Sequence, residues 1–217
     1  MSCLVMAKAP VAGRAKTRLG ARVGMALAAD LAAAALLDTI DACVEAVGAE
    51  RCSLALEGDL AGAARGDEIA EALRGWHVFG QRGNELGERL ACAHADAPAG
   101  PRVQIGMDTP QVTSALLHAL LDGLGTHDAT LASATDGGWW ALAVARGDDA
   151  GPLVAVPMST ATTGDDTAAA LRAGGLTVAP GPVLCDVDTV EDAVLVTAQA
   201  PWTRFAASWR AIAERSA

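Results

Sequence analysis

The chain opens on an apolar run, Cys3-Leu-Val-Met-Ala7, which leads directly into the basic loop Lys8-Ala-Pro-Val-Ala-Gly-Arg-Ala-Lys-Thr-Arg-Leu-Gly20. The apolar run is typical of a buried strand. No acidic residue occurs before Asp30, although the chain has 26 acidic residues against 16 basic ones and a formal net charge of -10. A basic, glycine-containing loop after the first strand of an acidic protein indicates an anion site, and a nucleotide phosphate is the expected anion. A solvated basic loop is the alternative, but it would not require so long an absence of acids.

The composition limits the possible classes of protein. A chain of 217 residues without an internal repeat or a Pro/Gly/Ser-rich linker is expected to form one domain over 1–217. The most membrane-like stretch, residues 25–47, is interrupted by Asp30, Asp38, Asp41 and Glu45. We therefore expect a helix in water there and no membrane span. The N-terminus also lacks the order of a secretory signal, because its basic residues follow the apolar ones.

Cysteine usage and charge point to a cytoplasmic protein with a small ligand. The five cysteines are odd in number, widely spaced and without a CxxC pair, which is typical of reduced thiols in the cytoplasm. Net acidity argues against nucleic-acid binding, which needs a broad basic face. The basic loop is local and suits a small anion better. The oligomeric state stays open.

Strand-like and helix-like segments alternate along the chain. The expected strands are 3–7, 52–56, 76–79, 102–105, 129–134 and 139–145, with a short strand near Leu176 and a segment at 183–185. The expected helices are one through the stripe Leu36, Ile40, Val44 and Val47, then 60–73, 85–95, 113–124 and 163–173, and two beginning near Thr189 and Trp202. Such alternation predicts an α/β fold, with a mostly parallel sheet covered by helices on both faces.

Ligands of such sheets bind outside the carboxyl ends of the strands, so the loops there are candidate sites. Besides the basic loop, three segments qualify: Gly106-Met-Asp108-Thr-Pro110, Asp136-Gly-Gly138 and Asp186-Val-Asp188-Thr189. Mg²⁺ prefers carboxylate and phosphate oxygens, with one or two protein carboxylates completed by substrate and water. Acids at strand ends that face a phosphate loop would meet that need.

Each acidic segment also has a simpler interpretation. Asp188-Thr189 could only begin a helix by N-capping, and Asp136-Gly-Gly138 is an ordinary turn signature. Asp108 is harder to assign to a turn, because Gly106 and Pro110 fix the backbone around it. Other nucleotide and hydrolase motifs fail: Ala15 stands where the Walker pattern needs glycine, and neither G-x-G-x-x-G nor G-x-S-x-G is present.

Five ordered motifs resemble those of a known family. The motifs are 6–19, Gly83-Asn-Glu-Leu-Gly87-Glu-Arg89, Gly106-Met-Asp108-Thr-Pro110, Asp136-Gly-Gly138 and Asp186-Val-Asp188-Thr189. Together they resemble a bacterial domain-of-unknown-function family of GT-A-like transferases, usually labelled glycosyltransferases and sometimes associated with arsenosugar biosynthesis. Lys16-Thr-Arg-Leu19 is also similar to the phospholactate/phosphoenolpyruvate guanylyltransferases of coenzyme F420 synthesis. The sequence departs from the family at Asn84, Glu85, Met107, Trp140 and Met158.

The resemblance implies the nucleotide-diphospho-sugar transferase fold (GT-A-like, Rossmann-like), with a nucleotide and Mg²⁺ or Mn²⁺ at the strand ends. The implied catalytic residues are Lys16, Asp108 and Asp136. The implied nucleotide-binding residues are Ala7, Lys8, Gly13, Arg14, Lys16, Thr17, Arg18, Gly83 and Gly87. The implied metal ligands are Asp108 and Asp188. A loop from Pro157 to Asp166 is expected on the acceptor side.

Two reactions are compatible with the implied nucleotide-binding, metal-binding and catalytic residues. In glycosyl transfer, a nucleotide-diphospho-sugar loses its nucleoside diphosphate to an unknown acceptor. In nucleotidyl transfer, a phosphate or phosphonate acceptor attacks a nucleoside triphosphate and releases pyrophosphate. Three basic side chains in the first loop suit a triphosphate, whereas the family label and the acid-rich segment 136–188 favour glycosyl transfer. A nucleotide-binding protein without catalysis is a third possibility, against which the retained Asp108 and Asp188 argue.

Overall fold

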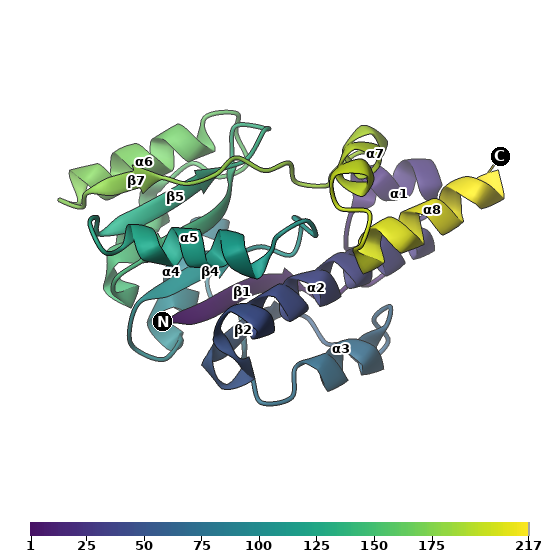
Figure 1. Cartoon of the computed structure of the whole chain (residues 1–217), viewed down its shortest axis with the longest axis horizontal. Coiled ribbons are helices and arrows are strands. Elements are labelled where there is room, and N and C mark those ends of the chain that lie inside the picture. Colours follow the sequence, from purple (N-terminus) through teal and green to yellow (C-terminus); the bar gives the residue numbers. More distant parts are fainter. Residues whose placement is uncertain (217) are drawn as a thin grey trace.

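A seven-stranded sheet forms the centre of the computed structural model, which describes residues 1–216 (Figure 1). The strand order is β3-β2-β1-β4-β6-β5-β7, and all neighbours pair in parallel except β6, which is antiparallel to β4 and β5. The strands are β1 (Ser2–Lys8), β2 (Cys52–Glu57), β3 (His77–Gly80), β4 (Arg102–Ile105), β5 (Ala129–Ser133), β6 (Trp139–Val144) and β7 (Val178–Pro180). The mostly parallel α/β sheet expected from the alternation is confirmed.

Helices cover both faces of the sheet and complete three layers. The α-helices are α1 (Thr17–Val23), α2 (Met25–Val47), α3 (Gly66–Ala72), α4 (Leu86–Asp96), α5 (Ser114–Gly123), α6 (Thr163–Ala173), α7 (Val190–Gln199) and α8 (Arg204–Ser216). Two 3₁₀ helices are η1 (Ala49–Arg51) and η2 (Gly147–Ala155). Apolar side chains of α2, α3 and α5 form the core on one face, and those of α4, η2 and α6 form it on the other.

A third apolar cluster lies beyond the sheet, where α1, α7 and α8 gather beside α2 (Figure 1). Leu19 of α1, Leu31 of α2 and Phe205 of α8 are buried in it. The carboxylate of Asp38, in α2, accepts hydrogen bonds from the backbone N–H groups of Arg204 and Phe205 at 2.9 Å each, which satisfies the first turn of α8. This cluster holds α1, and with it the end of the basic loop, against the rest of the molecule.

The structure differs from the sequence expectations in a few elements. The helix expected over 60–73 is shorter, because the chain turns through the left-handed region at Gly62 (φ 79°) and Arg65 (φ 51°) before α3 begins. Helix α1 and the 3₁₀ helix η2 were not expected from the apolar periodicity. The segment 183–185 forms a single bridge, Ala134 to Leu184. The antiparallel direction of β6 follows from the tight turn at Asp136-Gly-Gly138, which connects it to β5.

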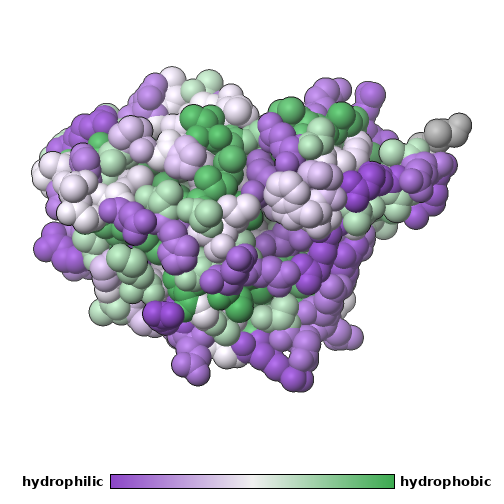
Figure 2. All heavy atoms as spheres, in the orientation of Figure 1, coloured by the Kyte–Doolittle hydropathy of each residue, from purple (hydrophilic) through white to green (hydrophobic). Residues whose placement is uncertain are grey.

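Within residues 1–216, no helix is both long and apolar enough to cross a membrane. Apolar residues reach the surface in separate groups, and the face drawn in Figure 2 is otherwise rich in hydrophilic residues. One such group lies on α7, where Val194 and Leu195 are 54% and 46% exposed. Helix α2, the most membrane-like stretch of the sequence, packs its apolar side chains against the sheet.

The strand order places the expected ligand site between β1 and β4. The chain leaves β1 toward β2 and β3 on one side, and then returns to add β4 on the other side. Val5 of β1 is in register with Ile105 of β4, so the loops that follow these two strands leave the sheet side by side. A crevice outside the carboxyl ends of the strands, at such a reversal of strand order, is where open α/β sheets bind ligands.

Candidate active site

The loop between β1 and α1 surrounds a cavity of about 300 Å³, which we call the basic cavity. The backbone turns through the left-handed region at Gly13 (φ 78°) and again at Lys16 (φ 49°). A Cβ added at Gly13 would meet no atom within 4 Å, so its backbone conformation and not crowding favours the glycine. The cavity is lined by Lys8, Arg14, Ala15, Lys16, Thr17, Arg18, Ala32, Met107, Asp108 and Asp188. It therefore gathers most of the predicted phosphate contacts.

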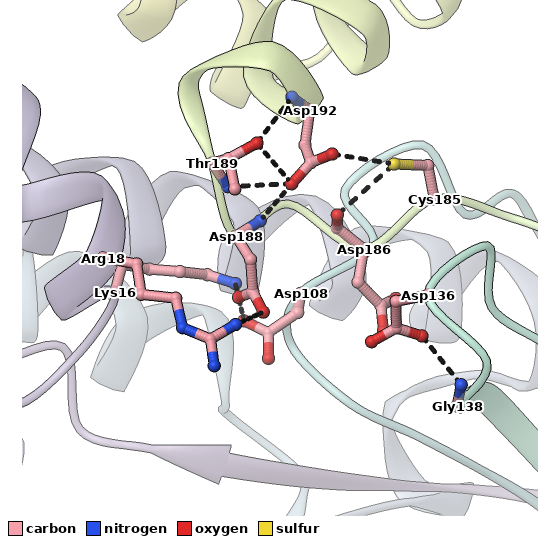
Figure 3. A network of polar contacts seen from close by, with 10 residues as sticks. All are labelled: Lys16, Arg18, Asp108, Asp136, Gly138, Cys185, Asp186, Asp188, Thr189 and Asp192. Atoms are coloured by element: carbon pink, nitrogen blue, oxygen red, sulfur yellow. Dashed lines mark hydrogen bonds and ion pairs between the residues drawn. The ribbon is translucent and has the colours of Figure 1, made fainter. Parts of the chain in front are cut away.

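Lys16 lies between two carboxylates at this cavity (Figure 3). Its Nζ is 2.5 Å from Oδ1 of Asp108 and 3.3 Å from Oδ1 of Asp188, and its side chain is only 7% exposed. Burial alone lowers the pKa of Lys16, but the charges of the two carboxylates outweigh burial and raise the pKa above its ordinary value. Nη1 of Arg18 is 3.7 Å from Oδ2 of Asp188, and the Arg18 side chain is 81% exposed. Lys16 is thus the fixed cation of the site, whereas Arg18 is open to an incoming ligand.

Two segments far apart in the sequence bring these carboxylates together. The backbone N–H of Val187 donates to the carbonyl of Asp108 at 2.9 Å. Next to it, Nε2 of Gln111 donates to the carbonyl of Cys185 at 2.6 Å. Because these bonds join the loop after β4 to the segment before α7, Asp188 faces the same lysine as Asp108. The predicted pair of metal ligands is therefore adjacent in space.

Thr189, and not Asp188, is the capping residue of α7. Thr189 Oγ1 accepts from the backbone N–H of Asp192 at 3.2 Å, and Oδ2 of Asp192 accepts from the backbone N–H of Thr189 at 2.8 Å. The N-capping interpretation of Asp188-Thr189 is correct for the threonine only. The carboxylate of Asp188 is left to face Lys16.

A second cavity, of about 310 Å³, lies on the other side of Asp108, and we call it the acidic cavity. Its walls are Met6, Leu86, Leu90, Gln104, Gly106, Asp108, Thr109, Asp136, Gly138, Trp139, Trp140, Met158, Ser159, Thr160, Thr163 and Asp186. Among the described residues, none of those lining it is Lys, Arg or His. Asp108 belongs to both cavities, so a ligand that occupies both would pass over this carboxylate.

Two tryptophans give the acidic cavity fixed aromatic walls. Trp139 packs with the core on the α4 and α6 face, and Trp140, 2% exposed, packs with the core on the α2 and α5 face. Nε1 of Trp139 donates to Thr167 Oγ1 at 3.0 Å, and Nε1 of Trp140 donates to the carbonyl of Pro182 at 2.9 Å. Because its indole N–H is satisfied within the protein, the Trp139 ring offers mainly apolar contact to a ligand, whereas the Trp140 ring is buried on the opposite face of the sheet.

Asp136 and Asp186 place two carboxyl groups on the wall of the acidic cavity (Figure 3). Burial, together with the charge of Asp108, raises the pKa of Asp186 to about 7, although Lys16 acts in the opposite direction. Oδ1 of Asp136 accepts from the backbone N–H of Gly138 at 2.8 Å. The turn interpretation of Asp136 is therefore correct, and it coexists with a place on the cavity wall.

The carboxylates fit a divalent cation that is shared with a ligand. No cluster of three or more His, Cys, Asp or Glu residues within 1–216 is arranged to hold a metal ion by itself. Asp108 and Asp188 nevertheless converge on one cation, the Lys16 ammonium. Burial, and after it the charge of Asp108, raises the pKa of Asp186, and a cation beside Asp108 would neutralise that charge. Two carboxylates completed by phosphate oxygens and water suffice for Mg²⁺.

Four of the predicted nucleotide-binding residues, Ala7, Gly13, Gly83 and Gly87, are not among the residues that line either cavity. Ala7 is buried at the end of β1, where its carbonyl accepts from Nε2 of Gln81 at 2.9 Å. Gly83 has a φ of 115° in the loop before α4. A Cβ at Gly87 would lie 2.3 Å from the carbonyl oxygen of Leu153, so this glycine allows α4 to pack closely against η2. The structure thus gives Gly87 a packing role.

Asp186 and Gln104 line the acidic cavity but were not among the candidate site residues. Asp186 could have been found by alternation, because residues two apart in an extended segment point the same way and Asp188 was already a candidate. Gln104 alternates with Val103 and Ile105 in a strand that also contains the polar residue Arg102, and no motif includes it. Nothing in the sequence alone places that strand position at a cavity.

The sequence matches the family described as "Uncharacterized protein conserved in bacteria (DUF2064)" over residues 39–160. The chain belongs to this family. No curated protein matches it. The expected family resemblance is thereby confirmed.

Solved structures share the fold over nearly the whole chain. A protein from Desulfovibrio desulfuricans G20, provisionally assigned as a nucleotide-diphospho-sugar transferase, is 26% identical with a TM-score of 0.80, covering 99% of this chain and 98% of that one. A CMP:2-keto-3-deoxy-manno-octonic acid synthetase complexed with CTP is 13% identical with a TM-score of 0.57, covering 93% and 99%. Rv0371c from Mycobacterium tuberculosis H37Rv, complexed with manganese, is 23% identical with a TM-score of 0.51, covering 90% and 97%. The nucleotide-diphospho-sugar transferase fold is thus confirmed.

Proposed function

We propose that this protein is a nucleotide-dependent transferase of one domain that moves a glycosyl group from a nucleotide-diphospho-sugar to a small acceptor. The relative provisionally assigned to that activity is similar over almost its whole length. The observation that carries the proposal is the opposite charge of two adjoining cavities. The basic cavity suits the diphosphate, and the acidic cavity suits the sugar and the acceptor.

The acidic cavity favours hydroxyl-bearing ligands over phosphorylated ones. Its wall contains Asp108, Asp136 and Asp186 and, within the described chain, no basic side chain. Of the three acidic side chains on this wall, Asp108 has a cation beside it, the Lys16 ammonium at 2.5 Å, whereas a phosphate or phosphonate acceptor would meet Asp136 and Asp186 with no basic residue on the cavity wall. Like charges repel strongly in a partly buried site. Sugar hydroxyls, by contrast, donate hydrogen bonds to carboxylates.

The chain's own residues can then be given roles. In the transfer, the acceptor oxygen bonds to the anomeric carbon while the bond from that carbon to the diphosphate breaks. Arg14, Lys16 and Arg18 stabilise the negative charge that develops on the leaving diphosphate. Asp136 accepts the acceptor's hydroxyl proton through the carboxylate oxygen that does not bind Gly138.

A divalent cation fits the same site. Asp108 and Asp188 would hold Mg²⁺ or Mn²⁺ together with the diphosphate, and the ion would supply further charge stabilisation to the leaving group. That a structural neighbour is a manganese complex supports divalent-metal use. Lys16 would then lie beside the ion and the phosphates.

Nucleotidyl transfer is the second candidate, and the basic cavity favours it. Lys8, Arg14, Lys16 and Arg18 all line this cavity against the two carboxylates of Asp108 and Asp188, and four cationic side chains could contact a triphosphate chain. The neighbour complexed with CTP shares the fold. In that reaction an acceptor oxygen would attack the α-phosphorus and pyrophosphate would leave.

The two reactions differ in their released product. We expect the purified protein, with Mg²⁺ or Mn²⁺ and a panel of sugar nucleotides, to release a nucleoside diphosphate slowly from one of them even without an acceptor. The Asp108→Asn variant serves as the control for contaminating hydrolases. Release of pyrophosphate from a nucleoside triphosphate, with no diphosphate from any sugar nucleotide, would reverse the choice between the two candidates.

A further inference from the structure

Gln104 is a buried polar residue on the wall of the acidic cavity. It lies in the middle of the sheet on β4, in register with Leu4 of β1 and Leu142 of β6. Its neighbours Val103 and Ile105 belong to the core on the α2 and α5 face, so the pleat directs Gln104 toward the α4 and α6 face. Gln104 is only 2% exposed and lines the cavity.

The amide of Gln104 is not satisfied by the protein. Its Oε1 is buried and has no hydrogen-bond partner within the described residues. A buried amide oxygen without a partner costs stability, and an apolar residue, as at the paired positions Leu4 and Leu142, would avoid that cost. The sheet therefore gains nothing from an amide at this position. A ligand in the cavity would supply the missing partner.

The surrounding wall defines the chemistry of that ligand. Trp139 offers an apolar ring face, while Asp136 and Asp186 accept hydrogen bonds from hydroxyl groups. Building on the proposed function, we propose that Gln104 is a specificity-determining residue that hydrogen-bonds a hydroxyl of a neutral sugar ring in the donor, and that anionic sugars are excluded. The carboxamide can both accept from and donate to such a ring, and it adds no charge to a cavity that already contains three carboxylates.

The test separates binding of the sugar from binding of the nucleotide. Titration calorimetry with Mg²⁺ would compare UDP, GDP and dTDP with the matching hexose donors (UDP-glucose, GDP-mannose and dTDP-glucose). We expect the wild type to bind one hexose donor more tightly than its diphosphate, and Gln104→Leu to lose about tenfold of that gain, as expected for one hydrogen bond. Affinity for the diphosphate alone should not change. The uronic acid counterpart of the best donor should bind no better than the diphosphate.

Thr130→Val is the matched control. Thr130 lies on β5 of the same sheet, is 3% exposed, and also has a buried hydroxyl without a partner, but it does not line either cavity. Both substitutions remove an unsatisfied buried polar atom, so both variants should keep or raise the melting temperature. Only Gln104→Leu should lose the additional affinity that the hexose donor has over its nucleoside diphosphate. If the leucine variant does not fold, Gln104→Met, of nearly the same length, replaces it.

The outcomes distinguish this inference from the proposed function. A wild type that gains affinity from the hexose, with the gain unchanged in Gln104→Leu, would overturn the role of Gln104 and leave glycosyl transfer intact. Tight binding of the uronic acid donor would overturn the exclusion of anionic sugars. A wild type that gains nothing from any hexose and releases pyrophosphate from a triphosphate would overturn both the proposed function and the role of Gln104.

Discussion

The basic cavity and the acidic cavity are almost equal in volume, about 300 and 310 Å³, and they share Asp108, yet their walls carry opposite charge. The cations of the basic cavity come from one continuous segment, residues 8–18, whereas its two carboxylates, Asp108 and Asp188, come from the loop after β4 and the segment before α7. The acidic cavity is assembled from residues of β4, β6 and several loops. Under the proposed function, the charge of each cavity and not its volume determines which part of the ligand binds there, with the phosphates on one side of Asp108 and the hydroxyl groups on the other.

The largest effect is expected at the residue the two cavities share. Asp108→Asn keeps the shape of the side chain but removes its charge, so transfer should fall on the order of 10³-fold, the upper range for one preorganised electrostatic contribution. Nucleotide binding without metal should persist or tighten, because a negative charge beside the phosphates is lost. Initial rates and calorimetry with a chelator would measure the two quantities. A wild-type rate in this variant would reduce Asp108 to a turn residue.

Asp136 tests whether the acidic cavity takes part in proton transfer. Asp136→Asn retains an oxygen that can accept from the Gly138 N–H, so the turn should survive. Acceptor-dependent turnover should nevertheless fall about 10²-fold, the lower range for loss of a general base. Asp165→Asn, in the first turn of α6 and outside both cavities, removes the same charge and should be silent. Equal rates for the two variants would remove Asp136 from the chemistry.

Lys16 tests the basic cavity. Lys16→Ala should weaken nucleotide binding by roughly 1.5–3 kcal/mol, the range for a hydrogen bond to a charged group. Arg22→Ala removes the same charge from the last turn of α1, outside both cavities, and should leave affinity almost unchanged. Calorimetry on the folded variants would compare them. Unchanged affinity in Lys16→Ala would separate this loop from the nucleotide.

The smallest expected effect concerns the charge of the acidic cavity in the ligand-free protein. The pKa of Asp186 is raised from its ordinary value of 3.8 to about 7, first by burial and then by Asp108. The native state therefore binds this proton more tightly than the unfolded state does, and the free energy of unfolding should fall as pH rises from about 4 to 7. The nearby Lys16 opposes the shift, and Asp136 and Asp188 add to it.

Asp186→Asn should remove that pH dependence. Because an amide does not ionise, the variant should be more stable than the wild type at pH 8, by roughly 1–2 kcal/mol after allowance for partial exposure, and nearly equal at pH 4. Urea unfolding in the presence of a chelator, at both pH values, measures the difference. Parallel pH profiles for the two proteins would mean that Asp186 titrates normally.

The sequence by itself determined the parts that depend on local patterns. The apolar runs and helical stripes gave the strands and most helices, because side-chain periodicity follows secondary structure directly. The basic cavity was predictable for the same reason, since its cations lie within one loop. Lys8, Arg14, Lys16, Thr17 and Arg18 line that cavity, and their contact with a nucleotide stays a prediction.

Tertiary structure alone decided the rest. The hydrogen bond from Val187 to Asp108 joins segments that no sequence spacing relates, and it places Asp188 beside Lys16. Gln104 faces a cavity only because α4, α6 and the loop at Met158 leave space over its strand. Gly87 fits a nucleotide motif by pattern, yet its close contact with Leu153 is a packing contact. Local charge and apolar periodicity depend on residues that are close in sequence, whereas the walls of a cavity depend on which distant segments the fold brings together.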